Sequence, residues 1–278
     1  MVNKTRKTQK KYKNKTKNKT KNKTKNKTKN KTKNKTKNKT KNKTKNKTKN
    51  KTKTNNKNPK LLLFSSCKKD NKFLYNAKKI INKKFKNTNN LKMAIIITAR
   101  YGFRNKSRTK LYEDCIKKVK SMNLHKLNIP YTLIDCSSKN NLKKFKENIN
   151  NSQIIFALGG DTFYLNYHLK KSKMDKLIIN KVNNTNTLYM ACSAGAILTG
   201  ETVYPGSILR FNQKSKIFHI NNTFKPKFLT KKKNQKGFKF LKNMDFMPHC
   251  TLNNKKKILN LKESKKIYCL PENNIFIK

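Results

Sequence analysis

Short apolar runs alternate with amphipathic segments along most of the chain, and this alternation narrows the available folds more than any other feature. The apolar runs have few polar positions, which is typical of strands buried on both faces. They are LLLFSS (61–66), MAIIITA (93–99), YTLIDC (131–136), QIIFALGG (153–160) and TLYMAC (187–192). Helical periodicity is expected in 70–85, 111–122, 142–149 and 162–182. The pattern predicts a three-layer α/β/α sandwich around a mostly parallel, doubly wound sheet.

The N-terminal part of the chain departs from this pattern. The tetrad NKTK repeats without a break from about Asn14 to Thr52 and contains no apolar residue. Such a segment cannot bury enough apolar surface to offset the entropy lost on ordering. We therefore expect residues 1–58 to form a disordered polybasic tail and residues 59–278 to form the folded domain.

The chain is strongly basic, with 73 Lys and Arg against 11 Asp and Glu and a net charge of +62. Residues 1–60 hold 28 of these basic residues and no acid, and the remainder is still basic. This charge favours non-specific binding of nucleic acid or other polyanions, above all by the tail. The alternative is a compositional bias, because Lys, Asn and Ile are abundant throughout and the lysines would then be solvated surface.

Several classes of protein are not favoured by this composition. The six cysteines include no C-x-x-C pair, and the N-terminus has no apolar signal segment, so free thiols in an intracellular, cytoplasmic protein are expected. The basic tail leaves nuclear import open. The longest apolar runs are too short to span a bilayer, so we expect no association with a membrane. No His, Cys or Asp cluster has ligand spacing, so neither a metal nor another cofactor is expected.

Two loops follow predicted strands, at the edge where α/β sheets place their active sites. In CSAG, Ser193 stands between small residues, after a strand and before a helix-like AGAILTG segment. This is the context of a nucleophile elbow, although Ala191 stands where the usual motif has glycine. The alternative is that small residues only let the strand and helix pack closely. In GGDTF, Asp161 or Thr162 can cap a helix, and a backbone N–H can serve an oxyanion.

A nucleophilic serine needs a general base, and four histidines are available. His125 and His168 fall on expected surface helices, whereas His219 alternates with apolar residues as in a strand. His249 ends the apolar stretch MDFMPHC, a position that suits a base, but local pattern puts it only modestly ahead of His219. Among the acids, Glu272 follows another apolar stretch, IYCL. The order Ser, His, acid is one in which catalytic triads occur on α/β sheets.

Four blocks of this sequence, in order and spacing, resemble the peptidase E and cyanophycinase family of serine peptidases. They are IIFALGGDTFYL, LYMACSAGAIL, MDFMPHC and IYCLPENNIFI. The resemblance extends over about residues 60–278. It implies a class I glutamine amidotransferase-like fold and hydrolysis of short peptides at bonds next to aspartate, as in Asp-Xaa dipeptides or β-aspartyl links.

The resemblance also implies roles for individual residues. The family's nucleophile falls on Ser193, the histidine of its Pro-His motif on His249, and the glutamate of its Leu-Pro-Glu motif on Glu272. The oxyanion donors would be the backbone N–H groups of Ala194 and Gly160. Related amidotransferases use a cysteine nucleophile, but the Ser-Ala-Gly-Ala register favours the serine over the adjacent Cys192.

This chain departs from the dipeptidases of the family at three places. Leu158 replaces the first glycine of a Gly-Gly-Gly-Asn-Thr-Phe motif, and Asp161 replaces its asparagine. An aspartate that the dipeptidases carry some fifteen residues after the serine has no counterpart here. We expect Asp161 and Arg210 to contact substrate, with Arg210 binding a substrate carboxylate.

The sequence therefore supports one main hypothesis and two rivals. The main hypothesis is a peptidase E-like serine peptidase with a Ser-His-Glu triad and a small peptide substrate. In the first rival, the domain is catalytically inactive or divergent and the basic tail binds nucleic acid. The second rival is an amidase or esterase that acts on another acyl substrate.

Overall fold

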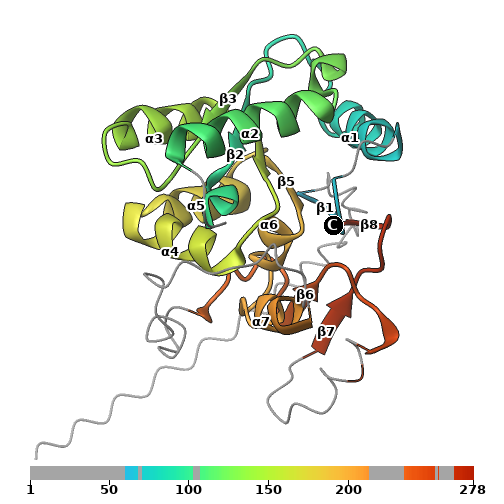
Figure 1. Cartoon of the computed structure of the whole chain (residues 1–278). Helices are drawn as coiled ribbons and strands as arrows, with labels where there is room; N and C mark the ends of the chain where they lie inside the picture. The colour runs from blue at the N-terminus through green and yellow to red at the C-terminus, as the bar shows by residue number, and fades with distance from the viewer. Residues whose placement is uncertain (1–59, 68–70, 103–106, 213–234, 254–255, 257–265) are drawn as a thin grey trace, which may run out of the picture. The chain divides into compact units, whose positions relative to one another are not determined.

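The computed structural model describes residues 60–67, 71–102, 107–212, 235–253, 256 and 266–278 (Figure 1). The predicted disordered tail, 1–58, lies outside the described residues, and so does His219.

A mixed six-stranded sheet forms the centre of the described part of the chain, with the order β3-β2-β4-β5-β1-β8. Five neighbouring strands run parallel, and β8 pairs with β1 antiparallel at the edge. The strands of this sheet are β1 (Leu61–Phe64), β2 (Met93–Ile96), β3 (Tyr131–Ile134), β4 (Ile154–Ala157), β5 (Leu188–Cys192) and β8 (Ile275–Ile277). The predicted mostly parallel sheet is confirmed, and each of its five predicted runs contains a strand.

Helices cover both faces of this sheet. They are α1 (Asn71–Lys84), α2 (Arg108–Ser121), α3 (Leu142–Asn151), α4 (Thr162–Ser172), α5 (Met174–Asn184), α6 (Ala194–Ile197) and α7 (Pro205–Asn212), with short 3₁₀ helices η1 (Thr98–Gly102) and η2 (Leu124–Leu127). The predicted helix over 162–182 is two helices, because Lys173 adopts a left-handed conformation with φ 61°. The predicted strand over 93–99 ends at Ile96, and η1 begins two residues later at Thr98.

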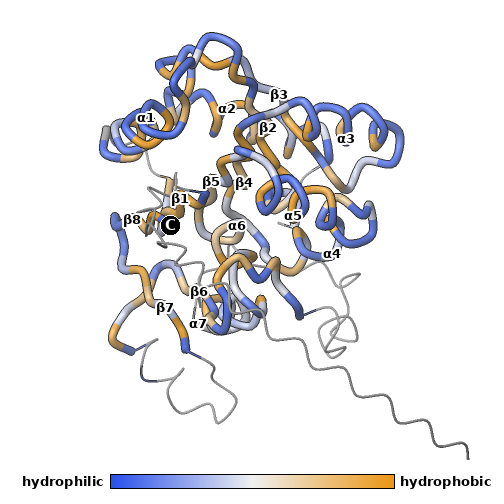
Figure 2. Tube along the Cα trace, turned by 180° about the vertical axis from the view of Figure 1, so that it is seen from behind, coloured by the Kyte–Doolittle hydropathy of each residue, from blue (hydrophilic) through white to orange (hydrophobic). Residues whose placement is uncertain are grey.

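Alternate residues of the fully buried strands β1, β2, β4 and β5 pack against different helices, which explains why these strands carry no polar face. The edge strand β3 is exposed at Tyr131 and Thr132. Leu62, Phe156 and Met190 belong to a buried cluster with residues of α1 and α2. Leu63, Ala157 and Ala191 belong to the cluster on the other face, with residues of α3 to α6. Figure 2 shows the resulting distribution, with apolar strands inside and hydrophilic outer helix surfaces. The three-layer α/β/α arrangement predicted from the sequence is confirmed.

Two further strands form a separate parallel pair, β6 (Met244–Met247) and β7 (Lys266–Cys269). Met247 lies opposite Cys269 in this pair, so the loops after both strands begin at the same edge. None of the helices in the described ranges is long and apolar enough to cross a membrane.

Candidate active site

Ser193 occupies the sharp turn between β5 and α6. Its backbone has φ 49° and ψ −114°, a combination that a non-glycine residue adopts only where the surroundings impose it. The Ser193 N–H donates to the Phe64 carbonyl of neighbouring β1 at 3.3 Å, which ties the turn to the sheet. The strand-turn-helix context expected of a nucleophile elbow is therefore present.

The small residues around Ser193 are required by close contacts between β4, β5 and α6. A Cβ atom on Gly195 would lie 2.5 Å from the Ala157 carbonyl oxygen, and one on Gly159 would lie 2.9 Å from the Ser193 Cβ. Both distances are shorter than van der Waals contact. The small residues therefore allow close packing of the strands and the helix, and they also allow the sharp turn at Ser193. The two interpretations made from the sequence are compatible.

The paired strands β6 and β7 carry the predicted base and acid to this turn. His249 lies two residues beyond β6, and Glu272 lies three residues beyond β7. The Leu270 N–H donates to the Met247 carbonyl at 2.8 Å, and the Cys250 N–H donates to the Leu270 carbonyl at 3.1 Å, so the pairing continues past the strand ends. Parallel pairing is thus the reason that two residues distant in sequence lie side by side.

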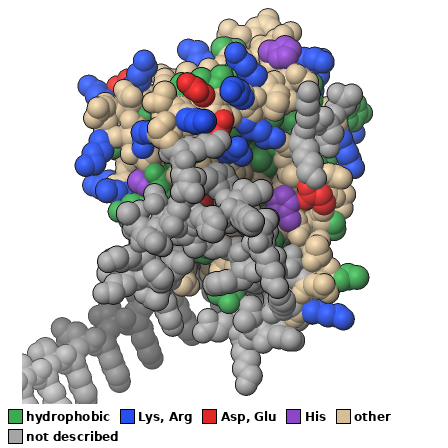
Figure 3. All heavy atoms as spheres, viewed as in Figure 1, with side chains coloured by type: hydrophobic (Ala, Val, Ile, Leu, Met, Phe, Trp, Pro, Cys, Tyr) green, Lys and Arg blue, Asp and Glu red, His purple; other side chains and the backbone are tan. Residues whose placement is uncertain are grey.

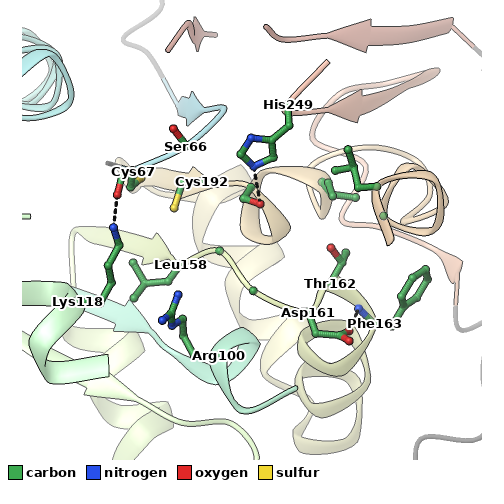
Figure 4. Close-up of a pocket in the computed structure, with 16 residues that line it drawn as sticks. Ser66, Cys67, Arg100, Lys118, Leu158, Asp161, Thr162, Phe163, Cys192 and His249 are labelled. Atoms are coloured by element: carbon green, nitrogen blue, oxygen red, sulfur yellow. Dashed lines mark hydrogen bonds between the residues drawn. The ribbon is translucent and has the colours of Figure 1, made fainter. Parts of the chain in front are cut away.

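A continuous chain of hydrogen bonds links the three predicted triad residues. His249 Nδ1 lies 2.5 Å from Glu272 Oε2. His249 Nε2 lies 3.0 Å from Ser193 Oγ, and Figure 4 draws this second contact as the dashed line from His249. A carboxylate only accepts hydrogen bonds, so Nδ1 carries the proton and Nε2 of the neutral ring accepts from the serine hydroxyl. This is the arrangement in which a histidine can take the proton of a serine.

The predicted oxyanion donors border the same turn. Ala194 is the first residue of α6, directly after Ser193. Gly160 has φ 149°, and a Cβ atom there would lie 2.3 Å from the Ala99 carbonyl oxygen, so the turn requires glycine. The backbone of Gly159 hydrogen-bonds Cys192. Of the two glycine amides, that of Gly160 is therefore the better candidate for an oxyanion.

The two residues predicted to bind substrate have different outcomes. Asp161 lies at the cavity wall, but its carboxylate caps α4 by accepting from the N–H groups of Phe163 and Tyr164 at 2.9 and 2.8 Å. This cap is the structural role that the sequence also allowed. Arg210 lies in α7, and its side chain is outside the described part of the structure.

The remaining candidate histidines and Cys192 lie as follows. His125 is exposed in η2, as expected. His168 was expected to face solvent but is half-buried against Tyr164 and Tyr167, and burial lowers its pKa to about 4. Cys192 is buried at the end of β5, where a hydrogen bond from the Cys67 thiol lowers its pKa.

A cavity of about 260 Å³ opens beside Ser193 and His249. Arg100 and Lys118 line it on the side of Cys67 and Cys192, as Figure 4 shows. The Lys118 ammonium group donates to the Cys67 carbonyl at 2.5 Å. Sequence patterns did not single out either basic residue, because basic residues are abundant throughout the chain. Arg100 had one available signal, its position directly after the predicted strand 93–99.

A third residue that sequence reasoning missed is Ser65, directly after β1. Its Oγ lies 3.1 Å from Glu272 Oε2 and 2.8 Å from the His249 backbone nitrogen. The one available signal was its position at the carboxyl end of a predicted strand, in LLLFSS.

Within the described ranges, no group of three or more His, Cys, Asp or Glu side chains is arranged to hold a metal ion. The groups gathered around Ser193 are of the kinds that acyl transfer requires: a hydroxyl, an imidazole hydrogen-bonded to a carboxylate, and backbone amides at a helix start.

Two solved structures are similar to this chain in fold. One is a crystal structure of a candidate peptidase E protein from Listeria monocytogenes EGD-e, which is 17% identical to this chain with a TM-score of 0.53. The matched region covers 78% of this chain and 96% of the Listeria chain. The other is a peptidase from an acI-B1 Actinobacterium, which is 18% identical with a TM-score of 0.55. The matched region covers 78% of this chain and 82% of the actinobacterial chain. No curated protein sequence matches this chain significantly.

The sequence profile of peptidase family S51 matches residues 61–274. This range includes every strand of the central sheet except β8, and it includes Ser193, His249 and Glu272. The predicted membership of this family of serine peptidases is confirmed by this match, and the two structural neighbours agree with it in fold. The chain belongs to peptidase family S51 and is a serine-type peptidase.

Proposed function

We propose that this chain hydrolyses short peptides through an acyl-enzyme formed on Ser193, with His249 as general base and Glu272 as the acid that orients it. The observation that carries the proposal is the hydrogen-bonded chain from Ser193 Oγ through the imidazole to Glu272 Oε2. The strained backbone of Ser193 supports it, because strain of this kind is kept where function needs an exposed nucleophile.

The proposed reaction has two halves. Ser193 Oγ attacks the peptide carbonyl carbon while His249 Nε2 takes its proton, and the N–H groups of Ala194 and Gly160 hold the oxyanion. The imidazolium then gives that proton to the leaving amine, and the C–N bond breaks. A water molecule, deprotonated by the same nitrogen, attacks the acyl ester. The ester C–O bond then breaks, the imidazolium returns the proton to Ser193 Oγ, and the acid product leaves.

The substrate we propose is a dipeptide or similarly short peptide with an aspartyl residue at the bond cleaved. Arg100 and Lys118 support this preference, since both line the cavity beside Ser193, and a cationic wall favours a carboxylate side chain. Asp161 is better explained as the cap of α4 than as a substrate contact.

The test is hydrolysis of a panel of Asp-Xaa, β-Asp-Xaa and neutral dipeptides by the full chain and by its Ser193→Ala variant. We expect release of amino acids by the wild type and a loss of at least a thousandfold in the variant, with unchanged thermal unfolding. Equal and negligible rates in the two folded proteins would overturn the proposal, and hydrolysis of simple esters or amides alone would favour the amidase or esterase.

The preference for aspartyl substrates has its own test in Lys118→Met and Arg100→Gln. Each should lower kcat/KM at least tenfold for Asp-Xaa and leave neutral dipeptides within about threefold. A uniform change across the panel would remove the support for an aspartyl pocket.

We propose separately that the polybasic tail, residues 1–58, binds nucleic acid without sequence specificity. The described surface supplies a comparison, because on the face in Figure 3 the Lys and Arg side chains are spread out rather than gathered in one patch. Salt-dependent binding of a random DNA duplex should therefore disappear when the tail is deleted. Binding that survives the deletion would assign it to the domain instead.

A further inference from the structure

The hydroxyl of Ser65 connects the predicted base to the predicted acid. Ser65 is fully buried directly after β1. Its Oγ lies 2.8 Å from the His249 backbone nitrogen and 3.1 Å from Glu272 Oε2. One side chain from the central sheet therefore contacts both residues that the pair β6 and β7 carries.

The direction of each hydrogen bond follows from the groups involved. The His249 N–H donates to Ser65 Oγ, so the hydroxyl proton of Ser65 is available for the Glu272 carboxylate, which can only accept. Glu272 Oε2 then accepts from both Ser65 Oγ and His249 Nδ1, at 3.1 and 2.5 Å. Two donors on one oxygen restrict the orientation of the carboxylate more than the histidine alone would.

The histidine backbone also needs such a contact. His249 has φ 53°, in the left-handed region that non-glycine residues seldom occupy. Its N–H is held by Ser65, and its ring is held by Glu272 and Ser193. The hydrogen bond that the His249 N–H donates to Ser65 Oγ therefore fixes the backbone from which the imidazole extends.

Ser65 is itself placed relative to the nucleophile by the sheet. Phe64, the preceding residue, pairs with Cys192, and its carbonyl accepts the Ser193 N–H. The Ser65 N–H donates to the Asn274 carbonyl at 3.3 Å, next to β8. The end of β1 thus contacts the nucleophile turn, the histidine and the segment that carries Glu272.

We propose that Ser65 is a positioning residue that holds His249 and Glu272 in line with Ser193. This inference rests on the proposed function of the triad. Ser65 does not contact the reacting atoms, so its loss should slow the chemical step and leave substrate binding nearly unchanged.

The experiment compares Ser65→Ala and Ser65→Cys with wild type in the full chain, on the best dipeptide of the panel. We expect Ser65→Ala to lower kcat about ten- to hundredfold, with KM within about threefold. Ser65→Cys keeps the shape of the side chain with a slightly larger atom, but its thiol donates only weakly, so it should lose most of the same activity. The matched control is Ser152→Ala, because Ser152 is also a buried serine with a hydrogen bond, from its Oγ to the Asn148 carbonyl at 2.7 Å, far from the triad. This control should keep wild-type kcat.

A double-mutant cycle separates positioning from general destabilisation. If Ser65 acts through the carboxylate, Ser65→Ala should lower kcat far less in a Glu272→Gln background than in wild type. Full additivity of the two changes, or wild-type kcat in Ser65→Ala, would overturn the inference. If the wild type is active and Ser193→Ala is inactive, either of these two results overturns the role of Ser65 and leaves the proposed function of the triad standing. An inactive wild type overturns the role of Ser65 and the proposed function together.

Discussion

The substitution Glu272→Gln tests the triad most directly, because it removes one charge and nearly preserves the side-chain shape. In the wild type the carboxylate lies 2.5 Å from His249 Nδ1. When Ser193 gives up its proton, the imidazole becomes a cation, and Glu272 stabilises that cation in the transition state. Glutamine supplies no such charge. If its amide group donates to Nδ1, the ring keeps its proton on Nε2, which can no longer accept from Ser193.

The magnitude follows from the separation and exposure of the two groups. Charge centres about 4 Å apart interact by about 1 kcal/mol in water and about 4 kcal/mol at an effective dielectric constant near 20. The His249 and Glu272 side chains are 30% and 36% exposed, so solvent screening places the interaction between these limits. A loss of about 1 to 3 kcal/mol corresponds to a decrease in kcat of about 5- to 150-fold, and the changed tautomer adds to it.

The assay is steady-state hydrolysis of the best dipeptide, with kcat and KM determined separately. KM should change little, since the carboxylate acts on the histidine and not on the substrate. Glu147→Gln, an exposed charge change on α3, is the control and should behave as wild type. If Glu272→Gln keeps kcat within threefold of wild type while Ser193→Ala is inactive, Glu272 is not the orienting acid.

Three further predictions concern the surroundings of the triad and the stability of the domain. Cys192→Ala should keep kcat within about threefold while Ser193→Ala loses it; loss in the cysteine variant alone would make Cys192 the nucleophile. Gly195→Ala should lower the free energy of unfolding in urea by about 1 to 3 kcal/mol, because its Cβ would lie 2.5 Å from the Ala157 carbonyl oxygen; wild-type stability would show that α6 can move away from β4. Burial lowers the pKa of His168 to about 4, so the unfolded chain binds a proton first as pH falls. Stability should therefore decrease between about pH 6.5 and pH 4, by up to about 2 kcal/mol after screening, and His168→Phe should remove that part of the slope; equal slopes would contradict it.

The fold class could be predicted because its signal is local. Five apolar runs without a polar face require burial on both sides, and amphipathic segments between them supply the covering helices. The elbow at Ser193 was also readable, since small residues after a strand are what its close contacts with Ala157 and Gly159 demand. Local periodicity did not reveal the break at Lys173, which depends on a single left-handed residue within an otherwise helical stretch.

The hydrogen-bond partners of the candidate nucleophile, Ser193, depended on strand pairings that no local pattern contains. From residue patterns alone His249 stood only slightly ahead of His219, and the resemblance to a family was needed to choose it. The structure brings His249 and Glu272 together because β6 and β7 run parallel in register. Asp161 had two possible roles from sequence, and its hydrogen bonds to the start of α4 favour the cap.

The amino-acid sequence by itself determined the layered α/β domain and indicated Ser193 as the candidate nucleophile, because burial periodicity and turn chemistry act between residues close in the chain. Only the tertiary structure decided which groups complete the site. Ser65 and Glu272 are 207 residues apart and are joined by a 3.1 Å hydrogen bond. They meet because β8 pairs antiparallel to β1, which returns the segment before β8 to the carboxyl end of the central strands. A contact of that kind is set by strand order and direction, and these follow from the packing of the whole domain.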